Sequence, residues 1–272
     1  MDRPNPANIL ADFERQGFVG PLRVFSSEQA QKYRAALEAY EAEYGSTSKL
    51  HMKSHLYLAF AWELTRTPAI ADFARQLMGP DVLILASRFW IKEAGNTAFV
   101  SWHQDSTYFG LEPDLYFNMW IALSDASVEA GCMRFIPGSH TSGIVEHEMK
   151  LEPDNLLTRG QTIPGLDASK GVPLPLQPGE CSIHHGHVMH WSPPNLASDR
   201  RIGFGLSFIP AHVRSTTGRR SATLLCGEDK HGHWDLDPYP TQDRDPVIGE
   251  LMHRETKRYV PGEKLAQERQ GA

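Results

Sequence analysis

A histidine and an aspartate two residues apart are the clearest candidates for metal chemistry in this sequence. Residues 99–105 read Phe-Val-Ser-Trp-His-Gln-Asp and end in His103 and Asp105. On an extended backbone such side chains point the same way, so that the imidazole and the carboxylate can reach one point. Two histidines and one carboxylate on one face of a metal, with other positions open, form the site of non-haem Fe(II) oxygenases. The pair therefore predicts a second histidine ligand further along the chain.

The same spacing occurs again at His233 and Asp235. His103 follows an apolar run that is typical of a strand, whereas His233 lies shortly before Pro238 and Pro240, in a stretch with the composition of a loop. We interpret the second match as a coincidence.

Six histidines between the pair and residue 191 are candidates for the remaining ligand. They are His140, His147, His184, His185, His187 and His190. Their neighbours differ. His190 follows a Pro-Gly turn and a short strand, and Arg201 stands eleven residues after it at the start of the next expected strand.

Composition favours one large globular domain. The chain has 272 residues, of which 40% are hydrophobic, enough for a substantial core. A net charge of −6 argues against nucleic acid or an anionic membrane surface as a partner, and no run of 18 apolar residues predicts a membrane span. Residues 1–6 lack a signal-peptide pattern. The scattered Cys132, Cys181 and Cys226 predict reduced thiols and a cytoplasmic location.

Sequence periodicity predicts helices before residue 80 and mainly strands after it. We expect helices at about 27–44 and 68–77, and a third helix at 246–258. The expected strands are 82–91, 116–124, 132–136, 174–176, 181–185 and 201–209. Many short strands after N-terminal helices predict a mainly β fold with a jelly-roll or cupin-like barrel.

We expect one domain over residues 1–272. Its expected parts are a helical N-terminal part (1–80), a β core (81–210) and a polar C-terminal extension (211–272) without a core of its own.

Residues 10–210 resemble the phytanoyl-CoA dioxygenase family, which includes ectoine-hydroxylase-like enzymes. The family pattern is His-x-Asp, Trp-x-Ala-Leu, Pro-Gly-Ser-His, His-x-Ser-x-x-Asn and then an arginine eleven residues after that last histidine. In this chain the pattern is matched by residues 103–105, 120–123, 137–140 and 190–195 and by Arg201. One departure is Trp191, where the family commonly has glycine.

The resemblance implies a double-stranded β-helix that holds Fe(II) through His103, Asp105 and His190 and uses 2-oxoglutarate and O2. It implies that Arg201 binds the C5 carboxylate of 2-oxoglutarate, and a planar guanidinium suits a carboxylate better than a lysine does. Three further residues are expected beside the cosubstrate: Ser192, Trp120 and Lys92. For Trp120, plain core packing is an equal alternative.

The implied reaction is hydroxylation, or another oxidation, of a small organic metabolite, with release of succinate and CO2. Halogenating relatives replace the carboxylate ligand by a small residue, so Asp105 favours hydroxylation. The rival is a non-oxidative cupin, such as a metal-dependent isomerase or a metabolite-binding barrel, which would not need Arg201 and Ser192. The identity of the substrate, the oligomeric state and the role of the extension are left open by the sequence.

Residues 51–58 carry an unusual set of polar side chains before the β core begins. They are interpreted either as a surface connection or as a pocket wall that touches substrate. In the second interpretation Lys53 and His55, together with Tyr108 after the metal pair, contact the substrate. Such a cationic, hydrogen-bonding lining suits a small polar or anionic molecule.

Overall fold

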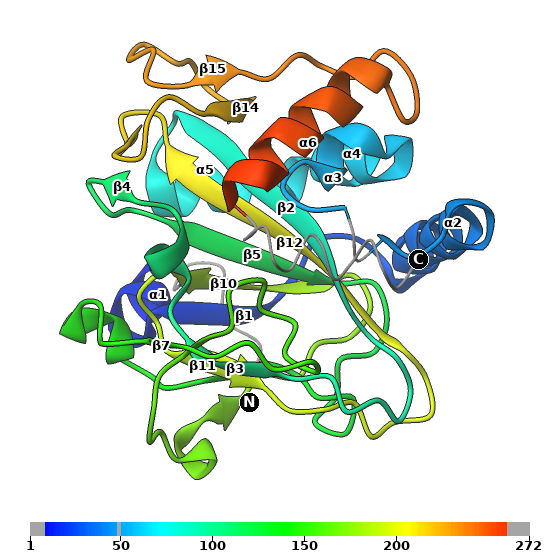
Figure 1. The fold of residues 1–272 in the computed structure, drawn as a ribbon, viewed down its shortest axis with the longest axis vertical. Helices are drawn as coiled ribbons and strands as arrows, with labels where there is room; N and C mark the ends of the chain where they lie inside the picture. The colour runs from blue at the N-terminus through cyan, green and yellow to red at the C-terminus, as the bar shows by residue number, and fades with distance from the viewer. Residues whose placement is uncertain (1–8, 48–49, 260–272) are drawn as a thin grey trace.

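Two facing β-sheets form the centre of the molecule (Figure 1). The structure is a computed structural model that describes residues 9–47 and 50–259, so both ends of the expected domain, 1–8 and 260–272, lie outside the described residues. One sheet has seven strands in the order β1-β10-β5-β12-β2-β14-β15, and the other has four in the order β3-β11-β6-β9. The predicted mainly β, jelly-roll architecture is confirmed.

The elements have the following bounds. The seven-stranded sheet contains β1 (Phe18–Arg23), β10 (Glu180–His185), β5 (Phe117–Ala122), β12 (Arg201–Pro210), β2 (Val82–Lys92), β14 (Ser221–Cys226) and β15 (Asp235–Leu236). The four-stranded sheet contains β3 (Val100–His103), β11 (His190–Ser192), β6 (Arg134–Phe135) and β9 (Val172–Pro173). Two short pairs are β4 (Leu111–Glu112) with β13 (Arg214–Ser215) and β7 (Glu148–Met149) with β8 (Gln161–Thr162). The α-helices are α1 (Ile9–Gln16), α2 (Ser27–Tyr44), α3 (Ser54–Tyr57), α4 (Ala59–Thr65), α5 (Pro68–Met78) and α6 (Pro246–Tyr259).

Local signals explain where the two longer N-terminal helices begin and end. The Ser26 hydroxyl accepts a hydrogen bond from the Gln29 backbone N–H at 3.1 Å, which caps α2. Helix α5 begins with Pro68, whose fixed φ and missing N–H suit a first helical turn. Gly79 follows α5 with a φ of 91°, a conformation that favours glycine. Both helices confirm the sequence prediction.

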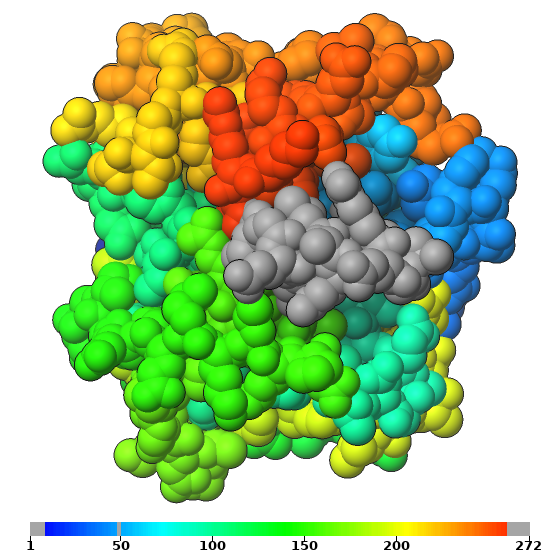
Figure 2. Space-filling view, in the orientation of Figure 1, coloured from blue at the N-terminus to red at the C-terminus, as the bar shows by residue number. Residues whose placement is uncertain are grey.

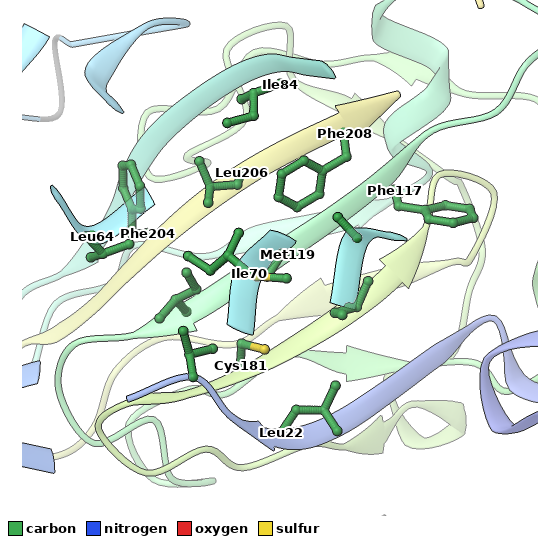
Figure 3. Packing of buried hydrophobic residues seen from close by; sticks show 14 of the residues in the cluster. Leu22, Leu64, Ile70, Ile84, Phe117, Met119, Cys181, Phe204, Leu206 and Phe208 are labelled. Atoms are coloured by element: carbon green, nitrogen blue, oxygen red, sulfur yellow. The ribbon is translucent and has the colours of Figure 1, made fainter. Parts of the chain in front are cut away.

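The two faces of strand β12 have different surroundings. The residues on the face that is covered by helices are buried and apolar: Ile202, Phe204, Leu206 and Phe208. They pack in one core cluster with Leu64 of α4 and Ile70 of α5 (Figure 3). Burial of this face under helices accounts for the strict alternation along the strand.

The inward residues of β12 face the smaller sheet. They are Arg201, Gly203, Gly205 and Ser207. A Cβ atom at Gly203 would lie 1.7 Å from Trp120 Cζ2, and one at Gly205 would lie 2.8 Å from Trp90 Nε1. The two glycines are therefore needed because two indole rings occupy the interior beside them.

The C-terminal extension is built into the same fold. Strand β14 pairs with β2 in the larger sheet, and the buried Ile248 and Leu251 of α6 pack against Leu56 of α3. In the space-filling view, α6 (red) forms part of the surface below the orange segment that precedes it (Figure 2). The extension thus adds a strand, which the sequence did not predict, and a covering helix, which confirms the helix expected at 246–258.

The described part of the chain has no disulfide and no membrane-spanning helix. Cys132, Cys181 and Cys226 are all free and buried. No helix within 9–47 or 50–259 combines the length and the apolar character needed to cross a membrane.

Candidate functional site

The smaller sheet brings His103 and His190 together. They pair directly between β3 and β11, and their ring centroids lie 4.1 Å apart. Asp105 begins the 3-10 turn that follows β3. Its Oδ1 atom lies 3.3 Å from His103 Nε2 and 4.0 Å from His190 Nε2. All three side chains are buried, and one ligand atom from each lies within 4.8 Å of the other two.

Hydrogen bonds select the tautomer of both imidazoles. His103 Nδ1 lies 2.9 Å from the Ser101 carbonyl oxygen, and His190 Nδ1 lies 3.1 Å from the Val188 carbonyl oxygen. Each Nδ1–H therefore donates to the backbone and leaves an Nε2 lone pair facing Asp105. Burial, aided by the neighbouring His103, lowers the pKa of His190 well below its usual value, which favours the neutral, ligating form.

The second oxygen of Asp105 has its own partners. Asn118 Nδ2 donates to Oδ2 at 3.1 Å, and His184 Nε2 donates to it at 3.0 Å. Burial raises the pKa of Asp105, but the adjacent His190, His103 and His184 outweigh that effect and hold it well below the usual value. The carboxylate is therefore ionised, with Oδ1 left to face the two Nε2 atoms.

This donor set fits a divalent first-row transition metal. Two neutral imidazole nitrogens and one carboxylate oxygen on one side of a buried cavity match the ligands and openness of a non-haem Fe(II) site. His187, one of the alternative candidates, lies elsewhere and contacts Asp114 Oδ2 at 2.6 Å. Of the six histidines, His184 also approaches the triad, but its near nitrogen is used by Asp105.

Arg201 lines the same cavity as the triad, together with Trp120, Trp191 and Ser192. Its guanidinium stacks on Trp120 at 4.9 Å from the ring centroid and donates to the Gly131 carbonyl oxygen at 3.0 Å. Burial lowers the pKa of Arg201 to about 10, so the group stays charged at neutral pH.

Within residues 9–47 and 50–259, no acidic group offsets that charge. Among the described residues, no carboxylate forms an ion pair with Arg201, and its Nε atom is buried without a hydrogen-bond partner. A buried, uncompensated guanidinium is unfavourable unless an anion binds beside it. The cavity therefore fits a dicarboxylate that reaches from the triad to Arg201.

The structure corrects the expected role of Lys92. Its side chain is fully buried, and it does not line the cavity that contains the triad and Arg201. Lys92 Nζ contacts the Ser192 hydroxyl at 2.7 Å, the Ser192 carbonyl oxygen at 3.1 Å and the Pro193 carbonyl oxygen. Burial, followed by the charge of Arg201, lowers the pKa of Lys92 to about 5. Lys92 thus positions Ser192 and is not itself part of the cavity wall.

Lys53 and His55 are also corrected, because neither lines a cavity near the triad. Lys53 is fully buried, and its Nζ donates to Asp237 Oδ2 at 2.7 Å. The His55 ring lies 2.7 Å from the Ser87 hydroxyl and 2.8 Å from the Thr223 hydroxyl. Residues 51–58 are therefore neither a surface connection nor, at these two positions, a substrate wall. Lys53 and His55 instead belong to a buried polar network with Ser87, Thr223 and Asp237.

Tyr108 does face a cavity, which adjoins the first one. The two cavities share Trp90, Asp105 and Asn118. Sequence reasoning missed Arg88, which also lines the second cavity. Alternation along the strand could have predicted the position of Arg88, since Lys92, Trp90 and Arg88 fall on one face of β2.

Similarity to known proteins agrees with this geometry. The sequence profile of the phytanoyl-CoA dioxygenase family matches residues 13–203. The rat phytanoyl-CoA dioxygenase domain-containing protein 1 is 30% identical over 171 residues, 61% of this chain and 58% of the relative. The chain thus spans less than two thirds of the length of that relative. The probable alpha-ketoglutarate-dependent hypophosphite dioxygenase of Stutzerimonas stutzeri is 28% identical over 200 residues, 72% of this chain and 67% of the relative.

A solved structure shares the whole fold. The non-heme monooxygenase ThoJ in its apo form has a TM-score of 0.79 and 28% identity, and the match covers 97% of this chain and 100% of ThoJ. ThoJ has also been solved as a nickel complex, which matches with a TM-score of 0.74. With the family profile matched over 13–203, a range that contains both histidines, Asp105 and Arg201, this chain belongs to the phytanoyl-CoA dioxygenase family.

Proposed function

We propose that this protein is an Fe(II)- and 2-oxoglutarate-dependent dioxygenase that hydroxylates a small organic molecule. The observation that carries the proposal is one buried cavity with two imidazoles and a carboxylate at one end and an uncompensated arginine at the other. In the overall reaction, substrate, O2 and 2-oxoglutarate give hydroxylated substrate, succinate and CO2. One oxygen atom of O2 enters a C–H bond of the substrate and the other enters succinate.

In this proposal His103, Asp105 and His190 hold the iron. When bound there, Fe(II) supplies the activation of O2 that is coupled to decarboxylation of 2-oxoglutarate. The backbone carbonyl oxygens of Ser101 and Val188 keep both rings in the ligating tautomer, as is usual around metal-bound histidines.

Arg201 binds the C5 carboxylate of 2-oxoglutarate, and the Ser192 hydroxyl stands beside it with Lys92 as its support. Trp120 and Trp191 line the cavity and keep water away from the reacting groups. Because Asp105 takes the third ligand position, no place is left there for a halide ligand, which favours hydroxylation over halogenation.

The name of the Stutzerimonas relative and the nickel complex of ThoJ support the use of 2-oxoglutarate and of a divalent metal. The direct test is whether 2-oxoglutarate raises the melting temperature of the Mn(II)-loaded protein, since a ligand that binds the native state stabilises it. We expect a rise with the parent protein and none with His190→Ala, while His233→Ala behaves like the parent. A non-oxidative cupin would show no rise with 2-oxoglutarate in any of the three.

A further inference from the structure

A second cavity adjoins the one that contains Arg201, and its wall includes Arg88, Tyr108 and Phe109. The shared Trp90, Asp105 and Asn118 connect the two. If the first cavity takes 2-oxoglutarate, the second is open to another molecule that reaches the metal site at Asp105.

Aromatic rings form much of the wall of this second cavity. Phe109 stacks on Tyr116 with centroids 4.9 Å apart and on Tyr259 with centroids 5.5 Å apart. Trp90 lines both cavities. Tyr259 ends α6, so the C-terminal extension supplies part of this wall. Flat, apolar faces of this kind favour a substrate with a planar hydrocarbon or ring body.

A cationic group lies on the inner face of β2 at this cavity. Arg88 pairs across to Gly205 of β12, and Lys92 pairs with Arg201. The positions of Arg88 and Lys92 are four residues apart, roughly 13 Å along the strand. The Arg88 guanidinium lies over Trp90 at 4.1 Å from the ring centroid. Each cavity is thus lined by an arginine, Arg201 in the first and Arg88 in the second, and Trp90 and Asp105 line both.

Further groups make the second cavity suited to an anion. Arg159 lies 5.8 Å from the Tyr108 ring and 5.4 Å from the Tyr259 ring, which adds positive charge nearby. The Tyr108 hydroxyl and Asn118 Oδ1 are buried and have no hydrogen-bond partner within the described part of the chain. Buried polar groups are seldom left unpaired, so these two are suited to contact a polar ligand.

We propose that the second cavity binds the primary substrate, and that this substrate is a small carboxylic acid with a flat apolar body. Its carboxylate pairs with Arg88 and accepts a hydrogen bond from the Tyr108 hydroxyl, and its body lies along Phe109, Tyr116 and Tyr259. The proposal rests on the dioxygenase function proposed above, because it assigns the first cavity to 2-oxoglutarate.

The test is calorimetric titration of the full chain, loaded with Mn(II) and 2-oxoglutarate, with carboxylates and their neutral analogues. The probes are benzoate, phenylacetate and 3-phenylpropanoate, each compared with the matching amide. At least one carboxylate should bind the parent protein roughly tenfold or more tightly than its amide, the effect of a charge-assisted hydrogen bond. Arg88→Gln should remove this preference, and Arg88→Lys should retain part of it.

The controls separate this proposal from the one on which it rests. Arg214→Gln removes an exposed arginine paired with Glu112 and should leave the preference intact, and Tyr108→Phe should weaken carboxylate binding several-fold. Titrations with Mn(II) alone report on the second cavity even if 2-oxoglutarate does not bind, so that a failure of the dioxygenase assignment is seen separately. Equal binding of acid and amide, binding of none of the carboxylates, or an unchanged preference in Arg88→Gln would overturn the proposal.

Discussion

His184 Nε2 lies 3.0 Å from Asp105 Oδ2, whereas the other carboxylate oxygen, Oδ1, is the one that approaches His103 and His190. Asn118 donates to the same oxygen. One carboxylate oxygen is therefore held by two donors, and the other is directed at the two imidazoles. The arrangement restricts Asp105 to one free oxygen and fixes its rotation before any metal binds.

We expect His184→Ala to lower the affinity for Fe(II) or Co(II) roughly tenfold or more, because partners that orient metal ligands have effects of that size. Equilibrium dialysis of the variant and the parent measures the change. His187→Ala is the matched control, since it removes a half-buried imidazole that contacts Asp114 instead. Equal affinity in the parent and His184→Ala would show that Asn118 alone orients Asp105.

Arg201→Lys should raise the KM for 2-oxoglutarate about tenfold or more while metal affinity stays unchanged. A lysine keeps the charge but loses the planar fork that matches a carboxylate. Steady-state succinate release at varied 2-oxoglutarate measures KM. Arg200→Lys is the control, because Arg200 pairs with Glu41 and Glu93 on the other side of the strand. An unchanged KM in Arg201→Lys would remove this residue as the anchor.

The buried pair of Lys53 and Asp237 predicts a loss of stability without a loss of substrate affinity. Lys53→Met leaves the Asp237 carboxylate buried beside an apolar chain, which should lower the free energy of unfolding by about 3 kcal/mol. Urea denaturation measures this change. Lys32→Met removes an exposed partner of Glu28 and should change stability by about 0.5 kcal/mol or less.

A double variant tests whether the unpaired Asp237 carboxylate causes this loss of stability. Lys53→Met combined with Asp237→Leu should recover much of the stability, because no buried charge is then left unpaired. If Lys53→Met alone is as stable as the parent, the ion pair contributes nothing to the fold.

Acid should destabilise the protein through His55. Burial, aided by the charge of Lys53, lowers the pKa of His55 to about 3, whereas an unfolded histidine has a pKa of about 6.5. Because the pKa of His55 is lower in the folded than in the unfolded state, its contribution to the free energy of unfolding is complete above the unfolded pKa. That contribution is lost as the pH falls toward the folded pKa. Between about pH 7.5 and about pH 5.5 this group alone should remove about 1.4 kcal/mol of stability.

Urea denaturation at those two pH values compares the parent with His55→Gln, which cannot titrate in this range. The variant starts with lower stability but should lose less of it on acidification. His253, which lies on α6, supplies a control variant, His253→Gln, whose acid response should match the parent. An identical acid response in His55→Gln would mean that other groups carry the effect.

Much of the fold was readable because its signals are local. The alternation along β12, the capping serine before α2 and the proline that starts α5 each act within a few residues. The ligands His103 and Asp105 are two residues apart, and the family pattern supplied His190 and Arg201. These residues could be named without knowing how the strands pair.

The remaining roles depend on residues brought together from distant parts of the chain. The sequence suggested that Lys53 contacts the substrate, but in the structure it forms a buried ion pair with Asp237, 184 residues later. A charged side chain is buried only when a partner compensates it, and nothing near Lys53 in the sequence reveals that partner. The same holds for Lys92 and Ser192, which are 100 residues apart and in contact.

The lining of the second cavity also depends on residues that are distant in the sequence. Tyr108 follows the metal pair and was named from the sequence, but Tyr259 reaches it only because α6 folds back over the sheet. Sequence by itself determined which residue types can ligate a metal and which strand face is apolar, since those depend on side-chain chemistry and backbone period. The pairing of strands and the packing of α6 determined which polar groups face a cavity and which face each other, because burial and charge compensation depend on contacts across the whole fold.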